Sequence, residues 1–428
     1  MLSIIPHRIK SKHVKWLSAL SVIVFLSLAI ASNRGLREEE WSSTNLRREL
    51  KSKKILFVSQ GGITDDVEGT LSSLGTFNMT RIQIQGHMGT STITEDIAAR
   101  WYTKNKHQYC SKEYDMIIIG DVVGFSRPFL TYNCPLPIVI YITDRYDQDL
   151  LEDLSYCQLI SEGCRRENVL CITNNEVEKV YALRVHDAAI WIRDIIPLSG
   201  MTLESKLEQR QRTKTVELPQ ATDETYFISD SGINYENFLK PMMRKIKTSP
   251  IIIPHNAHGG AKEMKDRLLI YAPHQLTSTN FYENLSQGVP NLKLFLSWKP
   301  KIAGIPSSHL TVHEMTQMNE WYNPAFSQFI CYFKKPTDLL EQSMFRKSCS
   351  SSAPNIRKEM QKYMQQHQTT VQNKWIKVDV HNNKRLIQKK NSCKSDRIGR
   401  EHIGRSEETS STSIIISSEQ ECKVKMIV

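Results

Sequence analysis

Short apolar runs that end in polar turns recur along the first half of the chain. Four of them are rich in β-branched residues and are bounded by Gly, Asp or Asn, at 53–62, 114–121, 137–144 and 168–175. Continuous apolar runs of this length are typical of strands that are buried on both faces. The segments between them are long enough for crossover helices. The pattern therefore predicts βα units and a parallel sheet covered by helices on both sides.

The same pattern returns after a polar break. Residues 202–223 are strongly polar and predict a linker. Strand-like and helical segments then follow, with strands at 225–229, 249–254, 267–271 and 291–296, and helices around 321–329 and 355–375. Beyond Val380 the chain is mostly Lys, Ser, Asn and Glu, which favours a disordered tail.

The predicted fold class is α/β, with two Rossmann-like domains in series after one N-terminal transmembrane helix. The predicted boundaries are an N-terminal domain at 53–205, a C-terminal domain at 220–340, C-terminal helices at 341–376 and a tail at 377–428. Two such domains joined by a linker are expected to bind ligands at the carboxyl ends of their strands.

The N-terminus has a different pattern. Residues 16–32 carry no charge and are about as long as the shortest helix that crosses a bilayer. The basic segment from Arg8 to Lys15 precedes them, and the acidic triplet Glu38 to Glu40 follows shortly afterwards. This bias predicts a cytoplasmic tail at 1–15, a signal anchor at 16–32, a stem at 33–52 and a lumenal remainder.

A cleaved signal peptide is the alternative for the same segment, because Ala29-Ile30-Ala31 is an acceptable cleavage site. Either interpretation sends the body of the chain into the secretory pathway. Two Asn-x-Ser/Thr triplets then fit the acceptor pattern for N-linked glycans. Asn78-Met79-Thr80 is the expected acceptor, whereas Asn284-Leu285-Ser286 is expected to lie inside the fold.

Composition narrows the classes of partner. The chain has 428 residues and a formal net charge of +11, but no zinc-finger spacing, basic zipper or aromatic RNA-binding signature accompanies the charge. Nucleic acid is therefore not an expected partner, and a membrane-surface interaction protein has only the charge in its favour. The nine cysteines contain no CxxC pair, so a zinc site has little support. Those in the first half either form lumenal disulfides or are small buried apolar residues.

The stretch from Tyr271 to Pro290 carries the most specific chemical signal. It predicts a strand, a small polar loop, and a helix that begins near Ser278 and ends at Gly288. A polar loop that leads into a helix N-terminus presents free N–H groups, which suits a diphosphate. Glu283 lies one turn further in, where a carboxylate can accept both hydroxyls of a ribose. The alternative is an ordinary glutamate that faces solvent.

This stretch resembles the donor site of glycosyltransferases with the GT-B fold, in which a Glu-x-Leu-x-x-Gly-x-Pro-like helix holds the nucleotide ribose. The matching residues are Glu283, Leu285, Gly288 and Pro290. The resemblance covers roughly Lys53 to Trp375. It implies nucleotide-sugar binding by the second domain.

Further donor contacts follow from the same resemblance. Ser278 and Thr279 open the donor helix, and the upstream segment 258–265 looks like the loop that faces the donor. In that loop Gly260 and Lys262 are assigned to donor binding, with Lys262 offsetting phosphate charge. The alternative for Lys262 is the solvated start of a helix. The first-half segments 119–129 and 143–147 are similar to the acceptor side of some eukaryotic transferases of this fold.

Sugar transfer needs a base that deprotonates the acceptor hydroxyl, or a group that stabilises a close ion pair. The candidates at strand ends are His87, Asp121, Asp144 and Asp147. Asp121 directly follows a buried strand and is expected to point into the cleft, unless it is a helix N-cap. Asp144 has the alternative of pairing with Arg145. The chain lacks a clear Asp-x-Asp metal site, so no metal and no cofactor beyond the nucleotide-sugar co-substrate is expected.

The resemblance implies a single-pass type II enzyme of the Golgi or ER membrane. Its expected reaction moves a sugar from a nucleotide sugar to a hydroxyl of a glycan or glycoprotein. The alternative is a catalytically inactive GT-B-like scaffold or chaperone for another transferase. His274 and Thr277 are unusual in the loop, and no obvious base is present, which keeps that alternative open.

Overall fold

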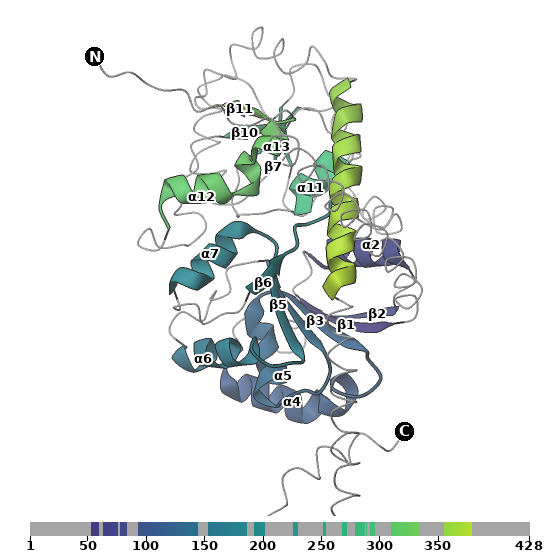
Figure 1. Ribbon diagram of the computed structural model, residues 1–428, viewed down its shortest axis with the longest axis vertical. Helices are drawn as coiled ribbons and strands as arrows, with labels where there is room; N and C mark the ends of the chain where they lie inside the picture. The colour runs from purple at the N-terminus through teal and green to yellow at the C-terminus, as the bar shows by residue number, and fades with distance from the viewer. Residues whose placement is uncertain are drawn as a thin grey trace, which may run out of the picture. The chain divides into compact units, whose positions relative to one another are not determined.

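The computed structural model describes the body of the chain with gaps. The described residues are 53–59, 63–75, 78–83, 93–143, 153–185, 192–201, 226–229, 251–253, 268–271, 279–286, 288, 292–295, 310–327, 329–333 and 355–378. The chain divides into two compact units, Met1–Lys51 and Ser52–Val428, and all described residues lie in the second. That unit is an α/β structure with two parallel sheets (Figure 1).

The first sheet has six parallel strands in the order β2-β1-β3-β4-β5-β6. In chain order its elements are β1 (Lys54–Ser59), α2 (Thr64–Leu74), β2 (Asn78–Gln83), α4 (Glu95–Tyr109), β3 (Met116–Asp121), η2 (Val123–Ser126), α5 (Arg127–Thr131), β4 (Ile138–Ile142), α6 (Leu154–Gly163), β5 (Val169–Thr173), α7 (Glu176–Val185) and β6 (Ile192–Ile195).

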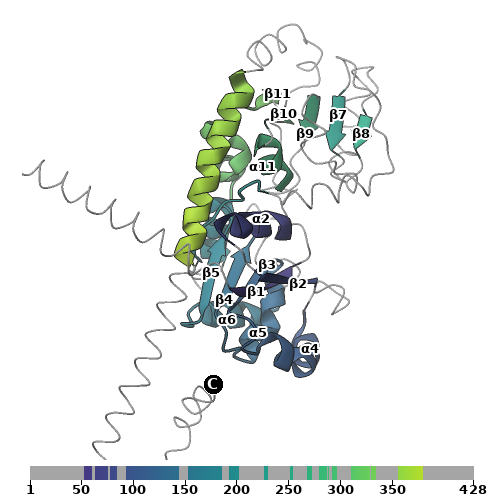
Figure 2. The same cartoon turned by 90° about the vertical axis from the view of Figure 1, so that its right-hand side faces the viewer.

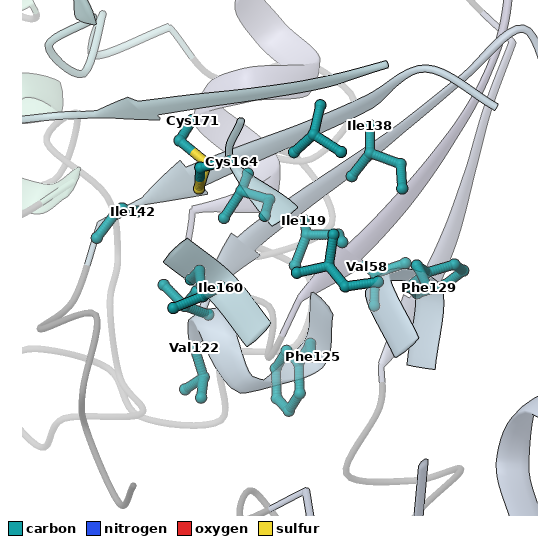
Figure 3. Packing of buried hydrophobic residues seen from close by; sticks show 14 of the residues in the cluster. Val58, Ile119, Val122, Phe125, Phe129, Ile138, Ile142, Ile160, Cys164 and Cys171 are labelled. Atoms are coloured by element: carbon teal, nitrogen blue, oxygen red, sulfur yellow. A yellow bond between two sulfur atoms is a disulfide. The ribbon is translucent and has the colours of Figure 1, made fainter. Parts of the chain in front are cut away.

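The four inner strands β1, β3, β4 and β5 are buried on both faces, as their apolar runs predicted. Alternate residues such as Val58, Ile119 and Ile138 join one core cluster with side chains of α5 and α6 (Figure 3). The cluster also contains side chains of α4. The strand neighbours of these alternate residues, such as Phe57 and Ile118, are equally buried on the other face. Because side chains of a strand point alternately to opposite faces, a polar residue within these strands would be enclosed on either side.

The second sheet has five parallel strands in the order β11-β10-β9-β7-β8. Its strands and the helices of this region are β7 (Tyr226–Ser229), β8 (Ile251–Ile253), β9 (Leu268–Tyr271), α11 (Thr279–Ser286), β10 (Leu292–Phe295), α12 (Val312–Met318), η5 (Glu320–Tyr322), α13 (Pro324–Ser327) and β11 (Cys331–Phe333). Counted from β8, the neighbouring strands of this sheet are its second, first, third, fourth and fifth strands along the chain. The first five strands of the other sheet have the same order, β2-β1-β3-β4-β5.

A long helix over 355–378 contacts elements of both regions. His367 stacks on Tyr282 of α11, with ring centroids 5.2 Å apart. Further along, Gln372 donates to Ser73 of α2 at 2.7 Å, and Trp375 packs edge-on against Tyr141 of β4. Figure 2 shows this helix passing α11 and α2. The helix was predicted for 355–375, and it extends slightly into the segment predicted as tail.

All eight predicted strands are present, with ends within a few residues of those expected. The sequence analysis missed β2, β6, β11 and α12. Both sheets lie within one compact unit, so a division into domains at 53–205 and 220–340 stays a prediction. Among the described residues no helix is long and apolar enough to cross a membrane, and the expected anchor at 16–32 lies outside them.

Two disulfides cross-link the first region. Cys110, at the end of α4, is bonded to Cys134, and Cys164, at the end of α6, is bonded to Cys171 of β5. Four of the five cysteines in the first half of the chain thus form disulfides, which was one of the two interpretations of the sequence. Such bonds are typical of proteins that fold in an oxidising compartment.

Candidate functional site

The winding of the first sheet defines where a ligand is expected. From β1 the chain crosses to β2 on one side, and β3 then lies on the other side of β1. At such a switch point the two crossovers lie on opposite faces of the sheet, and ligands of open α/β sheets bind beside the carboxyl ends of the strands there. Ser59 and Asp121 are the last residues of the two strands that flank this point.

Asp121 has an uncommon backbone conformation. Its φ is +61°, in the left-handed region that non-glycine residues rarely adopt. Strained residues of this kind persist where the surrounding structure holds them, and they cluster at functional sites. The carboxylate is 9% exposed, and Oδ1 accepts a hydrogen bond from Thr143 Oγ1 at 3.4 Å. Thr143 follows β4, so two strand ends fix this side chain.

The alternative interpretation of Asp121 as a helix N-cap is wrong. The next helical element is η2, and its N-cap is Val122. The carboxylate therefore lies at the carboxyl edge of the sheet and does not cap a helix.

Other polar side chains at this edge were not predicted as site residues. Ser59 Oγ and Thr64 Oγ1 are 2.5 Å apart, which links the end of β1 to the start of α2. Asn174 follows β5 and is fully buried, and its Nδ2 has no hydrogen-bond partner among the described residues. The signal that could have found Ser59 and Asn174 is their place at the polar end of an apolar run, since Ser59 ends β1 and Asn174 follows β5.

Arg127 organises the helices next to this edge. Its guanidinium is 3% exposed and donates to Asp153 Oδ2 at 2.5 Å, to Ser155 Oγ at 2.9 Å and to the Ile93 carbonyl at 3.2 Å. The hydrogen bond from Arg127 is the main cause that lowers the pKa of the Asp153 carboxyl to about 2. Asp153 also caps α6 by accepting from Tyr156 N. Arg127 thus joins α5 to the start of α6, and its role is structural.

The second candidate residue, Glu283, lies on α11. The helix begins at Thr279 and ends before Gly288, whose φ is +67°, as the stretch predicted. Glu283 is 7% exposed, so the interpretation as a solvent-facing glutamate is wrong. Its neighbour Asn284 is 8% exposed and lies inside the fold, as expected.

α11 packs directly on the segment that follows β6. Gly200 has a φ of +69°, and a Cβ added there would lie 2.4 Å from the carbonyl oxygen of Tyr282. Only glycine fits this position, because it lacks a Cβ and adopts positive φ without strain. Ser286 Oγ also donates to the Gly200 carbonyl at 3.0 Å. The end of the first region is therefore in close backbone contact with α11.

A buried carboxyl on α2 holds the same segment. Asp66 is 4% exposed and accepts from Ser199 N and Ser199 Oγ at 3.1 Å and from Gly200 N at 2.7 Å. Burial raises the pKa of Asp66 to about 7, although the Ser199 and Gly200 hydrogen bonds oppose it, and nearby Glu283 adds to the rise. The charged form is disfavoured because it is removed from water.

Aromatic groups surround this junction. His367 Nε2 donates to the Leu198 carbonyl at 2.7 Å, and burial lowers the pKa of His367. The Tyr282 hydroxyl hydrogen-bonds to the Glu320 carboxyl, and its pKa is raised well above its ordinary value, mainly by burial. The Tyr141 hydroxyl donates to the Ile196 carbonyl at 2.6 Å.

Tyr141 connects the two candidate positions electrostatically. Its pKa is raised well above the ordinary value, first by burial, then by the charges of Asp66 and Glu320, and finally by Asp121. Glu283 in turn acts on Asp66. Asp121 and Glu283 therefore each act on one member of the Asp66–Tyr141 pair.

The remaining predicted site residues are not described. His87, Asp144, Ser278, Lys262 and Gly260 lie outside the described residues, as does Asp147. Thr279 is the first residue of α11.

Among the described residues, no cluster of three or more His, Cys, Asp or Glu could hold a metal ion. In comparisons with known proteins, no family model matches this chain, and no curated protein matches it significantly.

Proposed function

We propose that this chain is a glycosyltransferase of the GT-B type. It moves a sugar from a nucleotide-sugar donor to a hydroxyl of a glycan or glycoprotein. In this proposal the six-stranded region binds the acceptor, and the five-stranded region binds the donor. The chain is held in the ER or Golgi membrane by residues 16–32, with its body in the lumen.

The observation that carries the proposal is the repeated winding of the two sheets. The third strand of each region lies next to its first, so each sheet has one switch point. Asp121 ends the third strand of the first sheet, and α11 follows the third strand of the second. Two equivalent ligand-binding edges, one for each substrate, suit a transfer between two bound molecules.

The helix geometry of α11 and the disulfides add support. The helix carries Glu283 one turn in and ends at a left-handed Gly288, as the resemblance to a donor site requires. The disulfides Cys110–Cys134 and Cys164–Cys171 suit the oxidising lumen in which such enzymes act.

In the proposed reaction Asp121 takes the proton of the acceptor hydroxyl as that oxygen attacks the anomeric carbon of the donor. Thr143 holds the carboxylate through its hydrogen bond. The bond from the sugar to the nucleoside diphosphate breaks, and the leaving phosphate is stabilised by the N-terminus of α11 and by Lys262. Glu283 positions the nucleotide through its ribose.

Turnover of the donor by the purified full chain tests this proposal. We expect release of nucleoside diphosphate that requires an acceptor, and a loss of about 100-fold or more in Asp121→Asn, because a positioned base contributes about 10²–10⁴-fold. Glu113→Gln changes an exposed carboxylate at the amino end of β3 and is the matched control. A wild-type chain without turnover on any nucleotide sugar would reject the enzymatic proposal.

One observation favours a second candidate, the catalytically inactive scaffold. Glu283 is buried beside Asp66, at a junction that fastens α2 to α11. A carboxylate confined to that structural task would leave the ribose without its partner. Nucleotide binding without turnover, or neither property in a well-folded chain, would support the scaffold.

A further inference from the structure

The two glycosylation triplets of the chain lie in opposite environments. Asn78 and Thr80 are both exposed. Asn284, by contrast, is 8% exposed and Leu285 only 1%. The hydroxyl of the third residue, Ser286, is already engaged, because it donates to the carbonyls of Gly200 and Glu283. A glycan on Asn284 is therefore incompatible with the described packing, whereas one on Asn78 disturbs no described contact of that side chain.

The position of Asn78 in the sheet is also suitable. It is the first residue of β2, which is the outermost strand on its side of the six-stranded sheet. Asn78 and Thr80 share one face, since strand side chains alternate. Arg81, on the opposite face, forms ion pairs with Asp65 and Glu68 of α2 and so anchors the strand from the side that α2 covers.

Asn78 lies far along the strand direction from the candidate site. In the parallel register it pairs with Lys54, the first residue of β1, whereas Ser59 at the other end of β1 pairs with Gln83. Asp121 is at the carboxyl end of β3. A large polar group on Asn78 therefore extends from the amino edge of the sheet and leaves the switch point accessible.

We propose that Asn78 carries an N-linked oligosaccharide, and that it covers the outer edge of β2. The proposal rests on the lumenal placement in the proposed function, which the two disulfides support. Asn78 Nδ2 attacks the anomeric carbon of an oligosaccharide linked to a lipid diphosphate. The anomeric C–O bond breaks, the lipid diphosphate leaves with the bonding electrons, and the amide loses one proton.

The glycan has a physical task at this place. An outer strand presents N–H and C=O groups that a strand of another molecule can pair with, and proteins cover or charge such edges to prevent aggregation. A hydrated oligosaccharide at the first residue of β2 blocks that approach. Asn78→Gln is therefore expected to leave catalytic turnover unchanged while it increases aggregation of the chain.

The test is expression of the full chain in cells with a secretory pathway, followed by digestion with peptide-N-glycosidase. The wild type is expected to show one downward shift in mass, with conversion of Asn78 to Asp in the peptide map and an unmodified Asn284. Asn78→Gln and Thr80→Ala should lose the shift. Thr80→Ser, which preserves the acceptor pattern, should retain it.

Peptide mapping under non-reducing conditions separates the possible failures. A wild type with the Cys110–Cys134 disulfide but no shift would overturn the glycan while leaving the lumenal placement intact. A chain with neither disulfide nor glycan would overturn both. A shift that persists in Asn78→Gln, or a glycan found on Asn284, would also overturn the assignment.

Discussion

The six-stranded and five-stranded regions share one strand order but differ in strand length. Strands β1 to β5 have five or six residues each, whereas β7 to β11 have only three or four. The first region also contains both disulfides found among the described residues. The two sheets thus share a strand order, but the strands of the second sheet are shorter.

The difference in strand length indicates that the two regions are stabilised in different ways. Long, doubly buried strands give the first region a core that tolerates strain, and the left-handed Asp121 lies in that region. The shorter strands of the second region are supplemented by packing at the junction, where α11 contacts Gly200 and the helix over 355–378. The account therefore predicts that the junction stabilises the second region more than the first.

The largest expected effect comes from breaking this junction. Gly200→Ala places a Cβ against the Tyr282 carbonyl at a positive φ, and we expect a loss of about 3–5 kcal/mol in the free energy of unfolding. Gly288→Ala is the matched control, because its φ is also positive but its Cβ would meet atoms only at 3.6 Å. That variant should lose about 1 kcal/mol. Denaturant unfolding measures both, and equal losses would contradict the role of the junction.

Removal of the disulfides is expected to lower the stability of the first region. Cys110→Ala with Cys134→Ala opens a loop with a sequence separation of 24, and Cys164→Ala with Cys171→Ala one of 7. Chain entropy predicts losses of about 3.5 and 2.5 kcal/mol. Hydrogen exchange should show the loss of protection in β3 to β5. Greater loss in β9 and β10 would be inconsistent with this difference between the two regions.

The pH dependence of stability reports on Asp66. Its pKa is raised from 3.8 to about 7 on folding, so the folded state holds the proton more tightly and stability falls as pH rises between these values. Between pH 5 and 7 the fall is about 2 kcal/mol. The lowered pKa of His367 acts oppositely, because its contribution is lost as pH falls below 6.5.

Two variants separate these opposing contributions. His367→Gln should steepen the fall in stability between pH 5 and 7, and Asp66→Asn should abolish it. Urea unfolding at several pH values provides the measurement. An unchanged pH profile in Asp66→Asn would show that the buried carboxyl is not the titrating group.

The smallest effect concerns the strain at Asp121. At a φ of +61° glycine is tolerated better than alanine, so Asp121→Gly should be more stable than Asp121→Ala by about 1 kcal/mol. Both variants should lack transfer activity, because both lack the carboxylate. Thermal unfolding and donor turnover measure the two properties. Activity in Asp121→Gly would remove Asp121 from the proposed mechanism.

The strands with continuous apolar runs could be predicted from the sequence because burial on both faces leaves a local signal. β2 was missed because its residues, Asn78 to Gln83, are mostly polar and contain no continuous apolar run. α12 did have a signal, the capping box of Thr311 and Glu314, which the sequence analysis did not use.

The site could be predicted only in part. The place of Asp121 at the carboxyl edge of the sheet was predicted because it comes at the end of a buried strand, and the end of α11 at Gly288 because glycine suits a positive φ. The structural role of Asp66, which holds the segment after β6 through hydrogen bonds, could not be predicted because its partner Ser199 lies 133 residues away. An acidic residue in the first turn of α2 has a sufficient local explanation in the helix dipole, so nothing in the sequence pointed to burial.

The central claim, that the second region binds a nucleotide sugar through α11, is tested most directly by thermal unfolding of the full chain. The unfolding is measured against a panel of nucleotides and nucleotide sugars, in the wild type, Glu283→Gln and the control Glu113→Gln. We predict stabilisation by one nucleotide class of about 2.7 kcal/mol at a hundredfold excess over the dissociation constant, retained in the control and lost in Glu283→Gln. No stabilisation by any nucleotide, or equal stabilisation in Glu283→Gln, would contradict the account.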